Sequence, residues 1–554
     1  MKRIGTSAFV LGILALTLAG PSRASAQAPS GSPGTGDPAR LDELVKYARQ
    51  KYAQGQAQPA PAQQKTLEER AGERPVIQLT VDQAVTMALE NNIELSIERL
   101  NPQLQDLSLA QTRGAFRPTL GSTVNANSAM PLPTSLLNGG QRVTNETANA
   151  NVNISQTLPW FGTNYTAAFN NGRTNTTSTF ATLNPQFTTQ LTATINQPLL
   201  RDFKIDNNRN QLATGTITRQ ITDITLRTRV TNITATTKNA YWDLLAAIRA
   251  IEAAKQSLAL AEKLIEDNRV RVEVGTLAPM DIISAQAEAA TRRQTLTQAE
   301  ATRRTAELVL KRLIVSETND PVWRASLEPI DVVQVRPITI NLDSAVTTAL
   351  DQRTDLLTAR KNLESSDINI RYLRNQMMPA LNATATLGTR GLGGDQFIRE
   401  NGVVVGTIPG GWPDAFAMMR QFEYPNWTLG ATFSYPLGKS AQEAAYARAK
   451  LQYQQSQSQI RALELTVATE VTNAALLVES TLRSMEAARA ARELQEKRLE
   501  NEQSKFEVGM STNFFVVQAQ RDLLDSQISE LRAALNYQKA IVAFERVQQT
   551  AGGI

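Results

Sequence analysis

The sequence lacks cysteine and histidine altogether among its 554 residues. The chain therefore cannot form disulfides, thiol nucleophiles, Cys/His metal sites or any histidine-dependent catalytic triad. Carboxylate-only or Ser–Lys chemistry would survive this exclusion, but no convergent set of residues in the sequence supports it. We expect a protein that is not an enzyme and that needs no cofactor or metal.

Long apolar runs are also lacking, apart from a short one at the N-terminus. Phe9–Leu18 follows Lys2 and Arg3 and precedes the small residues Ala24–Ala26, a pattern typical of a secretory signal peptide. The run is too short to span a membrane comfortably. We expect export and cleavage after Ala26, and an uncleaved anchor is the alternative.

Clustered positive charge is lacking as well, although the formal net charge is +5. Lys2, Arg3 and Arg23 belong to the predicted signal peptide, so the mature chain is closer to neutral. A nucleic-acid-binding surface needs a dense basic stripe with interleaved aromatics, and the sequence has none. We expect no nucleic-acid partner.

An internal repeat is the most informative feature that the sequence does contain. Thr80–Leu89 (TVDQAVTMAL) returns as Asn341–Leu350 (NLDSAVTTAL), and Glu273-Val-Gly275 returns as Glu507-Val-Gly509. Each copy carries helix-like and strand-like segments in the same order. A long duplication of this kind determines the architecture of a chain.

Strand-like segments in both copies alternate between apolar and small polar residues with a period of two, which places one set on each face of a sheet. The alternating segments are Leu120–Ala126, Leu191–Asn196, Leu381–Leu387 and Leu429–Tyr435. Aromatic residues lie near the strand ends, where the interfacial girdle of a membrane barrel would place them: Trp160, Phe161, Tyr165, Tyr424, Trp427 and Tyr435. The alternation alone fits a lipid-facing barrel and a soluble sandwich equally well.

Two long segments favour the barrel. Lys204–Val272 contains almost no helix breaker except Gly215, and Ser440–Phe506 contains neither proline nor glycine. Both are rich in strong helix formers. A helix of about 65 residues is about 100 Å long, which suits a coiled coil or the wall of a tube. A soluble coiled-coil rod would explain the helices but not the strands between them.

The repeat predicts one order of elements for both copies. A helix (Val81–Phe116 or Leu342–Met377) leads into strands, and a very long helix, a glycine turn and a returning helix follow. The first copy has more residues between its strands, and we read this surplus, around Trp160-Phe-Gly162, as one extra hairpin.

The expected segments cover the whole chain. They are a signal peptide at 1–26, a flexible Pro/Ala/Gln-rich lead at 27–78, first helices at 79–117 and 341–378, barrel strands and loops at 118–198 and 379–436, long tunnel helices at 199–315 and 437–550, and an inter-repeat connector at 316–340.

In this order of elements and in two motifs, the chain resembles the outer-membrane efflux proteins, the TolC-type channels. The motifs are Glu273-Val-Gly-Thr276 followed by Asp281–Gln286, and Glu507-Val-Gly509 followed by Asn513–Gln520. The resemblance extends from about residue 78 to residue 548. It implies an α+β membrane protein in which three protomers share one β-barrel in the outer membrane and one α-helical tunnel through the periplasm.

The resemblance also implies function and partners. It implies passive conduction of substrates, as the exit duct of a tripartite efflux or type I secretion system. The implied partners are two further copies of the chain, a periplasmic adaptor protein, an inner-membrane pump of RND or ABC type, and outer-membrane lipid. The alternative from another class is a periplasmic coiled-coil protein that tethers the envelope and is not a channel.

The glycine turns would be the periplasmic tip that meets the adaptor. The residues concerned are Gly275, Thr276, Gly509 and Met510. Glycine suits a sharp helix reversal because it tolerates positive φ.

Some members of the family constrict the tunnel with aspartates six and nine residues after the second-copy glycine. Here those positions hold Phe515 and Gln518, and the first-copy equivalents are Asp281 and Ser284. An anionic second-copy gate is therefore not expected. We hypothesise that Phe515, with Phe514, forms an apolar constriction that excludes water. The alternative is that both phenylalanines pack between helices.

Overall fold

The computed structural model describes residues 75–132, 142–274, 278–331, 338–400, 402–438 and 440–549, which belong to one compact unit. The predicted signal peptide and all but the last residues of the lead lie outside the described residues.

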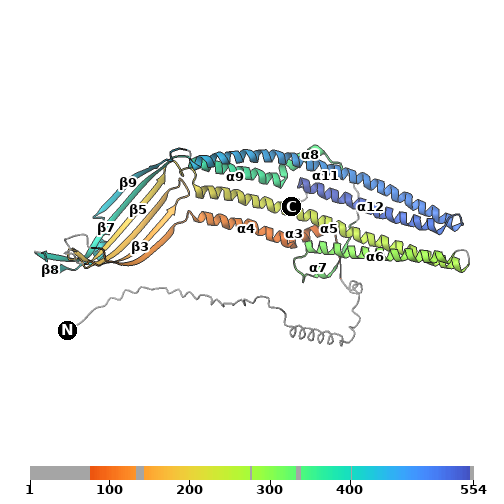
Figure 1. Cartoon of the computed structure of the whole chain (residues 1–554), viewed down its shortest axis with the longest axis horizontal. Coiled ribbons are helices and arrows are strands. Elements are labelled where there is room, and N and C mark those ends of the chain that lie inside the picture. Colours follow the sequence, from red (N-terminus) through yellow and green to blue (C-terminus); the bar gives the residue numbers. More distant parts are fainter. Residues whose placement is uncertain are drawn as a thin grey trace, which may run out of the picture. The chain divides into compact units, whose positions relative to one another are not determined.

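Two helical hairpins, one from each copy, form most of this unit (Figure 1). In the first hairpin α5 (Asn207–Glu273) is followed by α6 (Pro279–Ile314), and in the second α11 (Ala441–Glu507) is followed by α12 (Asn513–Gln548). The long helices have 67 residues each, which confirms the prediction from the breaker-free segments. Among the described helices, none combines the length and the apolarity that a membrane crossing needs.

The first helix of each copy is broken, so the prediction of one continuous helix over 81–116 and over 342–377 was wrong. The first copy has α3 (Val81–Asn91) and α4 (Ile93–Gly114), and the second has α8 (Leu342–Gln352) and α9 (Thr354–Gln376). At the first break Asn92 is extended, and its side-chain oxygen accepts a hydrogen bond from Leu95 N at 3.1 Å. Asparagine is a strong helix N-cap, and it starts a new helix here.

One antiparallel sheet contains the strands of both copies, and it lies at the opposite end of α5 and α11 from the hairpin turns (Figure 1). Its strand order is β2-β3-β4-β5-β7-β8, with β9 also paired to β7. The strands are β2 (Thr119–Ala129), β3 (Asn145–Thr157), β4 (Asn164–Thr176), β5 (Leu183–Pro198), β7 (Ala380–Glu400), β8 (Val403–Ile408) and β9 (Pro425–Ser434). The predicted extra hairpin is β3–β4, and it lies between β2 and β5 in the same sheet.

The second-copy loop contains two elements that the sequence did not predict. The strand β8 pairs with the C-terminal end of β7. The short helix α10 (Trp412–Arg420) packs against β7 and β5.

The prediction of a flexible lead over 27–78 was wrong at its C-terminal end, where the chain forms a small parallel sheet. Residues 76–78 lie in β1 (Val76–Leu79), which pairs with β6 (Ser326–Pro329) of the inter-repeat connector. Asp331 of the connector accepts hydrogen bonds from Val81 N and from the Tyr241 hydroxyl, each at 2.7 Å. Burial and the neighbouring carboxylate raise the pKa of Tyr241, so the phenol stays a hydrogen-bond donor.

The hydrophobic core lies under this small sheet, where α3, α5 and α6 meet. Leu244, Leu310 and Ile314 are fully buried there. A buried ion pair lies beside them on α6, where Lys311 Nζ is 2.7 Å from Glu307 Oε1. Lys311 also donates to the carbonyl oxygen of Ala325, next to β6. These contacts fix the connector to the helices.

Candidate functional site

The large sheet has one apolar face and one polar face. The pairing register aligns Phe169 with Leu191 and Leu387 with Trp427 on the apolar face. The apolar side chains of this face are exposed in the protomer, as Leu120, Val124, Val152, Ile154, Leu191, Ile195, Leu387, Trp427, Leu429 and Phe433 show. The opposite face is formed mostly by neutral polar pairs, which include Thr123–Asn151, Asn170–Gln190, Thr194–Thr386 and Thr386–Thr428, and it also carries Arg390 opposite Gln190. An exposed apolar face opposite a polar face suits a wall between lipid and water.

Both lateral edges of the sheet are open in the protomer. Within the described residues, β2 pairs only with β3, and β9 pairs only with β7. An unpaired strand edge cannot stand in the hydrocarbon of a membrane, because its backbone groups have no partner there. The two edges therefore need partner strands that a single protomer does not supply.

The turn at the far end of the second hairpin is a Schellman motif. Gly509 has φ +77°, its N–H donates to Phe506 O at 3.1 Å, and Met510 N donates to Lys505 O at 2.8 Å. This pattern satisfies the last carbonyls of α11 and needs a left-handed residue, which favours glycine. Gly275 and Thr276 of the first-copy turn lie outside the described residues.

The two phenylalanines at the start of α12 contact each other edge to face, with ring centroids 5.6 Å apart. Phe514 is 70% exposed and Phe515 is 54% exposed in the protomer. Within one protomer, therefore, neither ring is buried between helices. Two large apolar groups at a helix start remain free to contact another surface or to line a passage.

The remaining candidates of the constriction make hydrogen bonds of their own. Asp281 is in the first turn of α6, and its main-chain oxygen accepts a hydrogen bond from the buried Asn268. Gln518 Nε2 donates to Asp522 Oδ1 at 2.8 Å. For the part of the chain that the structure describes, no hydrogen bond or ion pair joins Asp281 or Ser284 to Gln518.

An ion cluster that sequence reasoning missed connects the two returning helices near the tip. Arg521 of α12 contacts both carboxylate oxygens of Glu288 on α6, with Nε 3.0 Å from Oε1. Arg292 of α6 holds the same carboxylate at 2.7 Å. The hydrogen bond from Arg521 and the charge of Arg292 lower the pKa of Glu288. The Glu288–Arg292 spacing of four residues was visible in the sequence, but nothing there indicated Arg521 as a partner.

A second contact joins the ends of the two long helices. The guanidinium carbon of Arg271 on α5 lies 4.0 Å from the ring centroid of Phe506 on α11. A cation over an aromatic face is attracted by the ring quadrupole. The Arg521–Glu288 pair and this cation–π contact thus both connect the hairpins near the tip.

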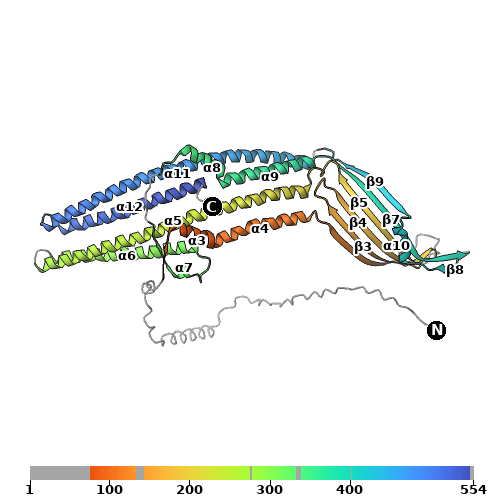
Figure 2. The same ribbon diagram turned by 180° about the vertical axis from the view of Figure 1, so that it is seen from behind.

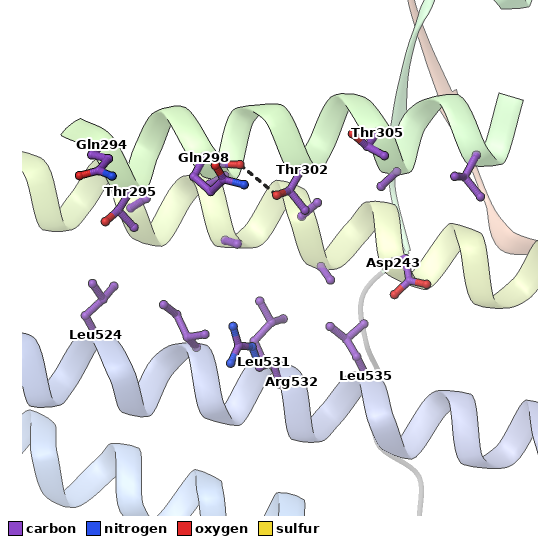
Figure 3. A pocket seen from close by; sticks show the side chains of 18 of the residues that line it. Asp243, Gln294, Thr295, Gln298, Thr302, Thr305, Leu524, Leu531, Arg532 and Leu535 are labelled. Atoms are coloured by element: carbon purple, nitrogen blue, oxygen red, sulfur yellow. Dashed lines mark hydrogen bonds between the residues drawn. The ribbon is translucent and has the colours of Figure 1, made fainter. Parts of the chain in front are cut away.

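Between the ion cluster and the core, an open groove of about 870 Å³ separates α12 from the first hairpin (Figure 3). Leu524, Leu531 and Leu535 of α12 face alanines of α5 and the threonine and glutamine side chains of α6. Atoms that line an open groove lack dispersion contacts on one side. Leu524 and Leu535 are nevertheless buried, and Lys539 of α12 pairs with Asp243 of α5, so the hairpins stay in contact along the sides of the groove.

Chemistry of other kinds finds no support in the described residues. Among them, no group of three or more acidic side chains is placed to hold a metal ion.

Comparisons with known proteins relate the strands and the hairpins to a protein family and to solved structures. The family model described as "Outer membrane efflux protein" matches residues 134–315 and 345–547. No curated protein sequence matches the chain.

Several solved structures share the fold. The CmeC outer membrane channel of Campylobacter jejuni is 14% identical, with a TM-score of 0.62 over 85% of this chain and 86% of that one. The outer membrane protein VceC of Vibrio cholerae is 14% identical, with a TM-score of 0.59 over 85% and 96%. The open state of the Neisseria gonorrhoeae MtrE outer membrane channel is 17% identical, with a TM-score of 0.56 over 85% and 88%.

Proposed function

This chain belongs to the outer membrane efflux protein family, and we propose that it is the passive exit duct of a tripartite efflux or type I secretion system. Membership places the protein in the outer membrane with an extension into the periplasm and makes it a transport channel. The proposal goes further in specifying a homotrimer that receives substrates from an inner-membrane pump.

The two-faced sheet with open lateral edges is the observation that carries the proposal. Three copies would close the wall if β9 of one protomer paired with β2 of the next, which would satisfy both edges. The polar faces would then surround water, and the apolar faces would meet lipid. On this proposal, 118–198 and 379–436 form the barrel.

The helical hairpins would form the tunnel. An α5 or α11 helix of 67 residues is about 100 Å long at about 1.5 Å per residue. Such a length suits a duct that crosses the periplasm. We assign 199–315 and 437–550 to this tunnel.

The partners follow from the passive role of the duct. Energy would come from a pump of RND or ABC type in the inner membrane, and a periplasmic adaptor would join pump and duct. We propose that the adaptor meets the turns at Gly275, Thr276, Gly509 and Met510, because Gly509 and Met510, the end of α5 and the start of α6 lie at the end of the hairpins that is opposite the sheet (Figure 1).

The tip would also be the narrow part of the duct. Phe514 and Phe515 are exposed in one protomer, so three pairs of rings could meet at the axis and exclude water. Asp281, Ser284 and Gln518 would lie in the same region, at the starts of α6 and α12.

Membrane fractionation and conductance together test the proposal. We expect a heat-modifiable trimer in the outer-membrane fraction that forms discrete channels in planar bilayers. Release by osmotic shock, without channel activity, would instead support the alternative of a periplasmic tethering protein.

The class of cargo needs a separate experiment. Deleting the gene and measuring both drug sensitivity and the secreted proteins would distinguish efflux from type I secretion. Increased sensitivity with unchanged secretion would assign efflux, and loss of a secreted protein would assign secretion.

A further inference from the structure

The short helix α10 packs against β7 and β5 near the end of the sheet that is away from the helical hairpins (Figure 2). The Thr189 hydroxyl donates to Ala415 O at 2.8 Å, and Thr189 is on the same face as Leu191, two residues further along β5. Phe416 of α10 contacts Phe169, which pairs with Leu191, at 6.2 Å between ring centroids. The helix therefore covers the face that the proposed function assigns to lipid.

Close packing holds α10 in this position. A Cβ on Gly391 or Gly393 would overlap the backbone of α10, so these glycines let the helix approach the strand directly. Thr389 Oγ1 donates to Met419 O at 3.3 Å, and Trp412 Nε1 donates to Asn171 Oδ1 at 3.0 Å. The position of the helix is thus specified by backbone contact and hydrogen bonds, and not by apolar burial alone.

The level of α10 along the strands is also defined. On β7 the exposed apolar band runs from Leu381, which pairs with Phe433, to Leu387, which pairs with Trp427. This length is about 20 Å at roughly 3.3 Å per residue, close to the apolar band of about 25 Å in outer-membrane barrels. The contacts of α10 begin at Thr389, about 7 Å beyond Leu387 on the same scale. On β7 the helix thus lies just beyond Leu387, and on β5 it begins at the level of Leu191, which pairs with Thr389, at the end away from the helical hairpins.

Aromatic and charged residues of α10 and of the segment after it remain exposed. Trp412 is 40% exposed, and Tyr424 is 62% exposed. Pro413, Asp414 and Arg420 are exposed on the helix itself. Aromatic rings mixed with charged groups are typical of the boundary between hydrocarbon and headgroups.

We propose that α10 is an interfacial helix that lies among the headgroups of the outer-leaflet lipids, with Trp412 and Tyr424 directed to the lipid boundary. The inference rests on the proposed function, which places the apolar face in lipid. Its occupant is the outer leaflet of the membrane, because α10 continues directly from the apolar band.

Site-directed spin labelling tests the inference, because the chain has no native cysteine. Single cysteines at Pro413 and Arg420 report on α10, Leu429→Cys reports on the apolar band, and Thr192→Cys reports on the polar face. Each labelled trimer is reconstituted into vesicles of outer-membrane lipid. Collisions of the nitroxide with oxygen, which enriches in hydrocarbon, and with a water-soluble nickel chelate then give its depth.

We expect the depth of each label to match the face of the sheet, or the helix, on which the label lies. Leu429→Cys should be accessible to oxygen and not to nickel, Thr192→Cys should show the reverse, and both α10 labels should be accessible to both reagents at an intermediate depth. Labels on α10 that behave like Thr192→Cys would place the helix in water and overturn the inference. Labels protected from both reagents would show that protein covers α10, which also overturns it. Nickel access at Leu429→Cys would overturn the proposed membrane placement itself.

Discussion

Arg521 of α12 binds Glu288 of α6 through both carboxylate oxygens and so joins the second-copy hairpin to the first. The pair lies about two turns into each returning helix, close to the tip. Glu288 is 11% exposed and is held by Arg292 on its own helix, so it presents a fixed carboxylate to Arg521. The open groove beyond it makes this pair a main connection between the hairpins at this level.

Arg521→Ala should loosen the tip of the duct. The substitution leaves Glu288 paired with Arg292 but removes the link to α12, so we expect higher single-channel conductance with a small loss of stability, about 1 kcal/mol or less. Arg498→Ala is the matched control, because Arg498 binds Asp522 at 3.0 Å within the second hairpin only. Equal conductance changes in both variants would contradict a specific role of the link.

The Arg521–Glu288 link should resist mild acid. Its arginine partners lower the pKa of Glu288, so the link is complete above the ordinary glutamate pKa of about 4.3. It is lost only as the pH falls through the lower pKa of the folded state. Wild-type conductance should therefore stay constant from neutral pH down to the ordinary glutamate pKa of about 4.3 and rise only at lower pH, as the pH falls through the lowered pKa of Glu288. Glu288→Gln should show high conductance at every pH, and a wild-type transition near neutral pH would refute this assignment.

Gly509→Ala should destabilise the second tip turn. Nothing lies within 4 Å of the added Cβ, so the cost comes from φ +77° and not from a clash. A left-handed alanine costs about 1 kcal/mol, which should speed amide exchange in the last turn of α11 by about fivefold. Gly114→Ala is the control, since Gly114 also has free space but no positive φ, and it should be neutral or slightly stabilising. Unchanged exchange in Gly509→Ala would show that the turn is not held in this conformation.

Lys311→Met should be among the most destabilising single substitutions in the chain. It would leave Glu307 buried without its cation, which costs roughly 3–5 kcal/mol. The double variant Lys311→Met/Glu307→Leu should recover most of that loss. Lys361→Met breaks an exposed pair with Glu364 and should change stability by less than about 1 kcal/mol. Thermal unfolding of the purified protein measures all three, and equal losses in the single and double variants would count against the buried pair.

Periodicity in the sequence was enough to predict the long helices and most strands. The period-two alternation of β2, β5, β7 and β9 and the lack of breakers in α5 and α11 are local properties, and local properties can be read from the sequence. The extra hairpin was also visible, because Val152 and Ile154 alternate with polar residues.

Contacts between distant segments could not be predicted in the same way. The pairing of β1 with β6 and the Arg521–Glu288 link depend on tertiary packing, which leaves no spacing signal. The break at Asn92 and the start of α10 before Pro413 had local signals, an N-cap residue and a proline at a first helical turn. A short helix inside a loop and a one-residue interruption are weak features beside long periodic segments, and both were missed.

The exposed rings of Phe514 and Phe515 give the last prediction. If three copies of Phe515 narrow the tunnel, Phe515→Ala removes an apolar ring that keeps water out, so single-channel conductance and leakage of small drugs should both rise. Phe515→Leu keeps an apolar side chain of similar reach and should stay close to wild type. If the rings instead pack against a neighbouring protomer, Phe515→Ala should lower the temperature at which the trimer dissociates and leave conductance unchanged. Measuring conductance and trimer dissociation on the same three proteins therefore separates a gate from a packing contact, because each role changes a different one of the two quantities.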